Sequence, residues 1–259
     1  MSGPSPEQPW LVADIGGTNA RFGLVTEPGG EPHRMKILRC GYHPDLVSAI
    51  ESYVDYLADS PRPHAACVAV AGPVDGDRFR LTNAEWDFSV AESRRRLGFA
   101  RLDLINDFTA LALALPHLPA QALRPIGALA RVPGKPIAVI GPGTRVSAEY
   151  LLSGPGLARL HQGLSIVHGV DAQPLAPEQV GERGRHGTDP VCAEALQMFC
   201  ALLGAFAGNV ALTFGARGGV VLGGGILSAI ATELIVAPTP ALLGASAWLN
   251  HNQRALEAA

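Results

Sequence analysis

The chain has 259 residues, of which 47% are hydrophobic and 17% are charged, and its formal net charge is -3. This composition predicts a folded chain with a buried core rather than a disordered one. Because no positive net charge recruits polyanions, we expect neither a nucleic acid nor an anionic membrane surface as partner.

The cysteines and the N-terminus indicate a protein of the cytoplasm. The four cysteines are scattered without C-x-x-C spacing, which argues against a zinc site and against a disulfide framework. The eight histidines likewise show no metal-ligand spacing. The first residues do not resemble a signal peptide, and no uninterrupted apolar run approaches about 18 residues, so we expect no membrane span.

The chain opens with two short apolar runs, residues 10–13 and 22–25, which predict a β-hairpin. Between them stands the stretch Asp14-Ile15-Gly16-Gly17-Thr18-Asn19. Gly16 and Gly17 can adopt positive φ and lack Cβ atoms, so the turn can direct backbone N–H groups towards a phosphate. Asp14 would repel a bare phosphate and therefore suggests a bridging Mg²⁺. The alternative is an ordinary hairpin turn.

Strands and helices then alternate, which indicates an α/β fold. The first half predicts strands at 34–42, 65–71 and 101–105, and helices at 90–97 and after an N-cap at Asp45. The dipeptide Asp75-Gly76 favours a tight hairpin into residues 78–81. The fully apolar strand at 65–71 is typical of a sheet that is covered on both faces.

The second half predicts helices at 108–115 and 147–152, a long core helix capped by Asp189, and a last helix at 241–256. Two further strands, 137–140 and 220–222, run into glycine turns at 141–144 and 223–225. The stretch 165–187 is polar and gives no clear prediction.

Three glycine turns at strand ends favour a nucleotide site, although each turn alone could be an ordinary loop. There is no P-loop motif, and no G-x-G-x-x-G at the first turn.

A polar pair, Asn106-Asp107, ends the strand at 101–105, where open α/β sheets bind ligands. Phosphoryl transfer to an alcohol needs a carboxylate to accept the hydroxyl proton, and Asp107 is the candidate. Asn106 offers both a donor and an acceptor to a sugar hydroxyl. The alternative is that the pair caps the helix that follows, and the two roles are compatible. By itself, Glu149 reads as a surface acid.

Several motifs in this order resemble bacterial ATP-dependent glucokinases, a group within the sugar kinase and actin-like ATPase superfamily. The matching stretches, spread over nearly the whole chain, are residues 11–21, 82–83, 104–110, 135–139, 146–149, 152–157, 218–226 and 240–244. The resemblance implies a two-domain actin-like ATPase (ribonuclease H-like) α/β fold with mixed sheets and an interdomain cleft. It implies a small domain of residues 1–107 with the C-terminal helix 241–259, a large domain of residues 108–240, and a cytoplasmic homodimer.

By the same resemblance, the chain would transfer phosphate from ATP to the 6-hydroxyl of glucose, with Mg²⁺ as cofactor and Asp107 as general base. Asn83, Asn106, Asp107 and Glu149 would bind the sugar. Asp14 would hold Mg²⁺ through water. The residues expected around ATP are Ala13, Asp14, Ile15, Gly16, Gly17, Thr18, Asn19, Gly141, Gly143, Thr144, Gly223, Gly224 and Gly225.

Two family segments are missing, one after Thr144 and a shorter one after Ile226. Our hypothesis is that cleft segments are left out of this numbering; the alternative is true deletion, which would leave an exposed sheet edge and an incomplete sugar pocket. True deletion would favour a catalytically impaired sugar-binding relative. A kinase for mannose or an N-acetyl amino sugar, and an actin-like ATPase without a sugar, are further alternatives.

Overall fold

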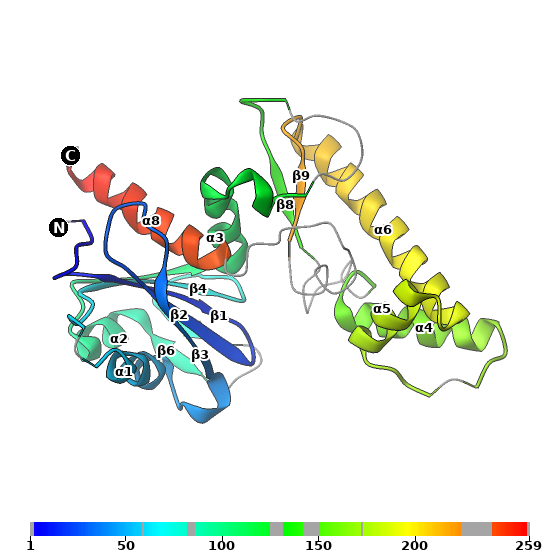
Figure 1. Cartoon of the computed structure of the whole chain (residues 1–259), viewed down its shortest axis with the longest axis horizontal. Coiled ribbons are helices and arrows are strands. Elements are labelled where there is room, and N and C mark those ends of the chain that lie inside the picture. Colours follow the sequence, from blue (N-terminus) through cyan, green and yellow to red (C-terminus); the bar gives the residue numbers. More distant parts are fainter. Residues whose placement is uncertain are drawn as a thin grey trace. The chain divides into compact units, whose positions relative to one another are not determined.

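The computed structural model describes residues 3–58, 60–81, 86–124, 132–141, 151–171, 173–223 and 240–257. The chain divides into two compact units, one formed by Met1–Leu118 with Pro238–Ala259 and the other by Pro119–Ala237 (Figure 1). The division falls after Leu118 and not after Asp107, because helix α3 (Asp107–Ala114) packs against the C-terminal helix α8 (Pro240–Glu257) of the first unit. The mixed α/β architecture is confirmed.

A five-stranded sheet forms the centre of the first unit, in the order β3-β2-β1-β4-β7. Its strands are β1 (Trp10–Ile15), β2 (Asn19–Val25), β3 (His33–Arg39), β4 (Ala65–Val70) and β7 (Arg101–Asn106). Strands β1 and β2 form the expected antiparallel hairpin. Strands β1, β4 and β7 run parallel to one another, so their carboxyl ends lie at one edge of the sheet.

Helices cover both faces of this sheet, which explains why every residue of β4 is buried. Along β1, Leu11, Ala13 and Ile15 pack with helix α1 (Leu46–Tyr56), whereas Trp10 and Val12 pack with α8. Alternate residues of a strand point to opposite faces, so the two sets form separate cores. Figure 1 shows α1 and α8 on opposite sides of the sheet. The predicted N-cap of α1 is confirmed: Asp45 Oδ1 accepts from the Ser48 backbone N–H at 2.7 Å.

The hairpin predicted at Asp75-Gly76 is wrong in its pairing. Strand β5 (Arg78–Arg80) pairs forward with β6 (Asp87–Ser89) in a separate two-stranded sheet. Arg78 Nε donates to Asp87 Oδ1 at 2.7 Å, and the cross-strand rings of Phe79 and Phe88 lie 5.9 Å apart. These opposite charges and paired rings favour the β6 partner. Helix α2 (Val90–Leu97) follows directly, as predicted.

The second unit combines a parallel strand pair with three packed helices. Its strands are β8 (Ala138–Ile140) and β9 (Val220–Leu222), and its helices are α4 (Gly154–Val167), α5 (Pro177–His186) and α6 (Pro190–Phe214). The helices share a buried core that includes Leu157, Val180, Cys192 and Phe199. Short 3₁₀ turns at Cys40–Tyr42, Leu115–His117 and Ala120–Ala122 complete the described elements.

Two helices of this unit differ from the sequence prediction. The glycines expected to end a helix instead begin α4, because Ser153 Oγ accepts from the Gly156 N–H at 3.0 Å and Pro155 is tolerated in a first turn. Residues 142–150, which hold most of the helix predicted at 147–152, lie outside the described residues. Helix α5 lies within the stretch that gave no prediction, since its polar composition concealed it.

Helix α6 changes the expectation about membrane spans. Within the described residues it is the one helix that is long and apolar enough to cross a membrane, with a mean hydropathy of 1.7 and 17% of its window buried. The sequence argument counted only uninterrupted apolar runs and therefore missed it. By itself such a helix is weak evidence, because core helices of soluble proteins pass the same test. Here Phe199 and Leu203 pack into the core, while Leu202 and Phe206 are each 37% exposed.

Candidate functional site

The polar residues predicted on β1 and β7 meet at the carboxyl edge of the first sheet. Ile15 pairs with Val70, which in turn pairs with Asn106, so the ends of β1 and β7 are separated by one strand. Since neighbouring strands lie about 4.8 Å apart, the two strand ends are about 10 Å apart. The charge of Asp14 acts on Asp107 across this distance. The fold therefore gathers Asp14, Asn106 and Asp107 at one edge.

Two backbone hydrogen bonds hold the glycine turn between β1 and β2. The Gly16 N–H donates to the Asn19 carbonyl at 3.0 Å within the turn, and the Thr18 carbonyl accepts from the Cys40 N–H at 2.9 Å. Gly16 and Gly17 are not among the described glycines with positive φ, so the turn does not use the conformational freedom that these two residues offer. A Cβ on Gly16 would meet only the Asn19 carbonyl, at an ordinary 3.7 Å. The space beside Gly16 is therefore open.

Asp14 is a partly buried carboxylate with one cationic neighbour. Asp14 Oδ2 accepts from Nη1 of Arg21 at 3.2 Å, and Arg21 is the residue directly opposite Asp14 in the β1–β2 hairpin. Burial raises the pKa of Asp14, and the Arg21 guanidinium partly offsets this rise. Sequence reasoning missed Arg21, although the register of a four-residue turn already places it opposite Asp14. A buried carboxylate of this kind has oxygen available for a hard cation such as Mg²⁺.

Asn106 is fully occupied by the surrounding chain. Its Oδ1 accepts from the backbone N–H groups of Phe108 and Thr109, at 2.9 and 3.3 Å, and caps α3. Its Nδ2 donates to the Gly72 carbonyl and to Asp107 Oδ1, both at 2.9 Å. The capping interpretation is therefore correct. Gly72, whose carbonyl accepts from Asn106, adopts a φ of +151° and was not singled out from the sequence.

Asp107 is half-buried at the first position of α3, and hydrogen bonds hold one of its two carboxylate oxygens. The Phe108 N–H and the Asn106 amide both donate to Oδ1, at 2.9 Å each, which leaves Oδ2 for a substrate hydroxyl. Burial raises the pKa of Asp107, and the nearby Asp14 charge raises it further, against hydrogen bonds that lower it. A raised pKa brings a carboxylate closer to the operating pH of a general base.

The substitution Asp107→Asn is expected to increase the thermal stability at neutral pH. A raised pKa means that the folded chain binds the proton more tightly than the unfolded chain, so the ionised carboxylate costs stability above its ordinary pKa of about 3.9. The gain should therefore disappear as the pH falls through the raised pKa towards that value. Thermal unfolding at a series of pH values measures this.

Asp87→Asn is the control. Because Arg78 lowers the pKa of Asp87, the loss of this carboxylate should lower the melting midpoint at neutral pH. Melting midpoints that change in the same direction in both variants would contradict the argument.

In the second unit, the structure describes only the first residue of each remaining glycine turn, Gly141 and Gly223. The Gly223 N–H donates to the Ile140 carbonyl at 2.8 Å, and Ile140 pairs with Leu222 in the parallel β8–β9 ladder. Gly141 and Gly223 thus follow neighbouring strand ends. The other predicted positions lie outside the described residues: Asn83, Gly143, Thr144, Glu149, Gly224 and Gly225.

A surface hollow of about 320 Å³ lies elsewhere in the first unit, along the edge strand β7. Its lining includes Asp77, Arg101, Asp103 and Trp248, and Trp248 Nε1 donates to Asp103 Oδ2 at 2.8 Å. None of the predicted site residues lines it. The candidate site is therefore the carboxyl edge that carries Asp14 and Asp107, not this hollow.

Comparisons with known proteins agree on one family. The family model described as glucokinase matches residues 11–144 and 144–235. A glucokinase of Aromatoleum aromaticum is 36% identical over 321 aligned positions, which cover 96% of this chain and 97% of the relative. A glucokinase of Chromobacterium violaceum is 41% identical over 273 positions, covering 88% of this chain and 78% of the relative.

Solved structures give the same result. A glucokinase from an Antarctic psychrotroph has a TM-score of 0.77 and 29% identity, covering 95% of this chain and 99% of the other. A ROK family glucokinase from Streptomyces griseus, in complex with glucose and AMPPNP, has a TM-score of 0.65 and 18% identity, covering 94% and 99%. The second likeness shows the fold alone, and both place the chain in the predicted fold class.

The comparisons also bear on the missing segments. The alignment with the Aromatoleum protein has 321 positions and the chain has 259 residues, so at least 62 positions of that alignment have no counterpart here. The two stretches matched by the family model meet at residue 144, where the sequence placed the longer gap. The full sequence has 259 residues, so these positions are absent from the sequence itself, and the hypothesis that they were left out of the numbering is wrong. The gap expected after Ile226 lies outside the described residues.

Proposed function

This chain belongs to the glucokinase family, whose activity is ATP-dependent phosphorylation of glucose, and on that premise we propose that Asp107 is the base that activates the sugar hydroxyl. The observation that carries the proposal is the position of Asp107. It stands half-buried at the carboxyl end of β7, with Oδ1 held by two donors and with Asp14 close enough to raise its pKa. This arrangement supports a fixed carboxylate poised to accept a proton.

The proposed reaction is a direct in-line transfer. The proton of the glucose 6-hydroxyl passes to Asp107 Oδ2 as the hydroxyl oxygen forms a bond to the γ-phosphorus of ATP. The bond between that phosphorus and the β–γ bridging oxygen breaks, and ADP leaves with the electron pair. Because such a transition state is loose, positioning and charge stabilisation provide most of the catalysis.

The turns at residues 16–18, 141–144 and 223–225 are the proposed ATP contacts. The open space beside Gly16 supports this role in the first unit, and the adjacent Gly141 and Gly223 support it in the second. Ala13, Ile15 and Asn19 stand at the two ends of the first turn. Asp14 would hold Mg²⁺ through water, and the bound ion would offset the negative charge of the phosphates.

Sugar binding is proposed for Asn83, Asn106, Asp107 and Glu149 from the family pattern. Since Asn106 already uses both lone pairs and both amide hydrogens, it would exchange one of these bonds for a sugar hydroxyl. Its bond to Asp107 makes it a positioning residue for the base as well. The same family pattern supports a homodimer in the cytoplasm.

A coupled assay with ATP and with glucose, mannose or N-acetylmannosamine tests this function. We expect turnover with glucose, and ADP and polyphosphate should be poorer phosphoryl donors than ATP. A preference for mannose or N-acetylmannosamine would reassign the substrate. The readout is NADPH formation for glucose and ADP release for the other sugars.

A second candidate function is glucose binding without phosphoryl transfer. The observation that favours it is the absence of at least 62 aligned positions, together with the break in the family match at residue 144, after which the sequence expected part of the sugar pocket. Calorimetric titration with glucose separates the two functions. Binding without turnover identifies a sugar-binding relative, whereas turnover identifies the kinase.

A further inference from the structure

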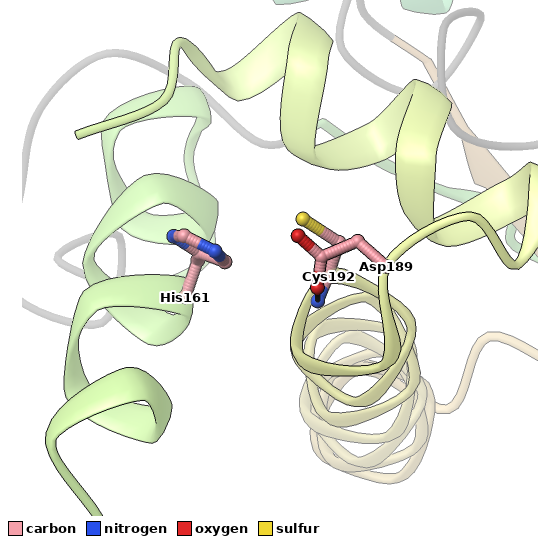
Figure 2. Close-up of side chains that lie close together, drawn as sticks. All are labelled: His161, Asp189 and Cys192. Carbon is pink, nitrogen blue, oxygen red and sulfur yellow. Dashed lines mark hydrogen bonds between the residues drawn. The ribbon is translucent and has the colours of Figure 1, made fainter. Parts of the chain in front are cut away.

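Three potential metal ligands meet inside the second unit, in a place that the proposed kinase reaction does not use. His161 lies on α4, Asp189 is the N-cap of α6, and Cys192 lies in the first turn of α6. One ligand atom from each residue lies within 4.8 Å of the other two. Figure 2 shows the His161 ring facing the thiol and the carboxylate from the opposite helix.

The imidazole of His161 is the unusual member of this group. Its side chain is 1% exposed, and neither ring nitrogen has a hydrogen-bond partner among the described residues. Buried polar groups are nearly always hydrogen-bonded, so a fully enclosed imidazole with two unpaired nitrogens needs a ligand to satisfy it. His64 also has two ring nitrogens without partners among the described residues, but His161 differs because a carboxylate and a thiol lie within reach of its ring.

The other two residues are positioned by the start of α6. Asp189 Oδ1 accepts from the backbone N–H groups of Val191 and Cys192, at 2.9 and 3.1 Å, so the carboxylate is held in place. The Cys192 thiol also hydrogen-bonds to this carboxylate, which brings two of the three ligand groups into direct contact. Cys192 is buried one turn into the same helix. Burial and the adjacent Asp189 carboxylate raise the pKa of the Cys192 thiol to about 11, so the thiol keeps its proton when no cation is present.

We propose that His161, Asp189 and Cys192 bind one zinc ion that ties α4 to the N-terminus of α6. One imidazole nitrogen, one carboxylate oxygen and one thiolate form a mixed ligand set that suits zinc, which accepts all three donor types. At the usual Zn–S and Zn–N lengths of about 2.3 and 2.0–2.1 Å, tetrahedral ligands lie about 3.5 Å apart. The three side chains would thus close by roughly 1 Å, and water would take the fourth position.

The sequence argued against zinc because the cysteines and histidines lack the usual close spacing. The fold supplies this site differently: Asp189 and Cys192 are neighbours at the start of α6, and His161 comes from α4, far from them in the chain. The Asp-Pro pair that begins α6 was recognised only as a helix cap. Since cap and metal ligand are compatible roles for the two oxygens of one carboxylate, the cap concealed the second role.

Zinc titration of the metal-free protein, in competition with a chromophoric chelator, tests the proposal. We expect one equivalent of zinc to bind tightly to the wild-type chain. Cobalt should give a thiolate-to-metal charge-transfer band and the intense visible bands of a four-coordinate site. Cys192→Ala and His161→Gln should each weaken zinc binding by at least about 100-fold, because even the loss of outer-shell partners costs 10–100-fold.

Matched control substitutions lie on α6 and at the C-terminal end of α4. Cys200→Ala removes an exposed thiol of α6, and His168→Gln removes an exposed imidazole next to α4 that pairs with Glu194 at 2.7 Å. Both should retain one equivalent of zinc and the cobalt spectrum. Circular dichroism selects variants that remain folded. The absence of stoichiometric binding to the wild-type chain would overturn the proposal, and so would equal binding by Cys192→Ala and Cys200→Ala. Neither outcome depends on kinase turnover.

Discussion

The substitution Asp107→Asn is expected to lower kcat for glucose phosphorylation by about 10²–10⁴-fold, the usual contribution of a general base. Asparagine has the same shape and keeps an oxygen for the Phe108 N–H, so the start of α3 and the hydrogen-bonding of Asn106 should be preserved. What is lost is the carboxylate that accepts the proton. The KM for glucose should change little, because the amide can still hydrogen-bond to the sugar.

Steady-state kinetics of the purified variant check this expectation. Asp55→Asn is the matched control, because Asp55 is an exposed aspartate near the end of α1 and is not one of the predicted site residues. It should retain the wild-type kcat. A kcat for Asp107→Asn within a few-fold of wild type would remove Asp107 from the role of base. The increased thermal stability expected of the same variant separates a loss of chemistry from a loss of folding.

The substitution Gly244→Ala is expected to destabilise the first unit by about 3 kcal/mol, at the upper end of the usual cost of overpacking. A Cβ at Gly244 would run into the backbone carbonyl of Ala110 on α3. A backbone atom cannot move aside as a flexible side chain can, so one helix must shift. Because α8 also carries Leu242, Ala245 and Leu249 into the core beneath β1 and β4, the shift would disturb that whole face.

Thermal unfolding should show this as a fall of about 6–12 °C in the melting midpoint, by the usual conversion for a domain of this size. Gly163→Ala provides the control in another helix. A Cβ at Gly163 meets nothing within 4 Å, and the residue is exposed on α4. Alanine there should be neutral or stabilise the helix by up to about 1 kcal/mol. Equal melting midpoints for the two variants would refute the close contact between α3 and α8.

Local features of the sequence were sufficient for much of the fold. The hairpin around the glycine turn, the cap at Asp45 and the long helix after Asp189 were all predicted from neighbouring residues. These elements are decided within a few residues, by alternation of apolar positions, by capping side chains and by turn chemistry. The strand at 65–71 was also predicted as buried on both faces, because its run of apolar residues has no polar side.

The errors have a common physical cause, which is competition between local preferences and distant partners. The Asp75-Gly76 turn favoured a hairpin with the preceding strand, but β5 pairs with β6, where Asp87 meets Arg78. Ser153 begins a helix where the adjacent glycines suggested an end. The freedom of Gly16 and Gly17 to adopt positive φ is not used, because the hydrogen bond from Gly16 to Asn19 closes the turn without it.

The sequence by itself determined the family and the α/β class, and it singled out Asp14 and Asp107 as candidate site residues. Short motifs that fold as local units carry this information. Only the tertiary structure decided which of these residues meet. Parallel pairing of β1, β4 and β7 brings Asp14 and Asp107 to one edge, and packing of α4 against α6 brings His161 to Asp189 and Cys192. Such meetings depend on strand order and helix packing between segments far apart in the chain, and no local pattern of residues records that information.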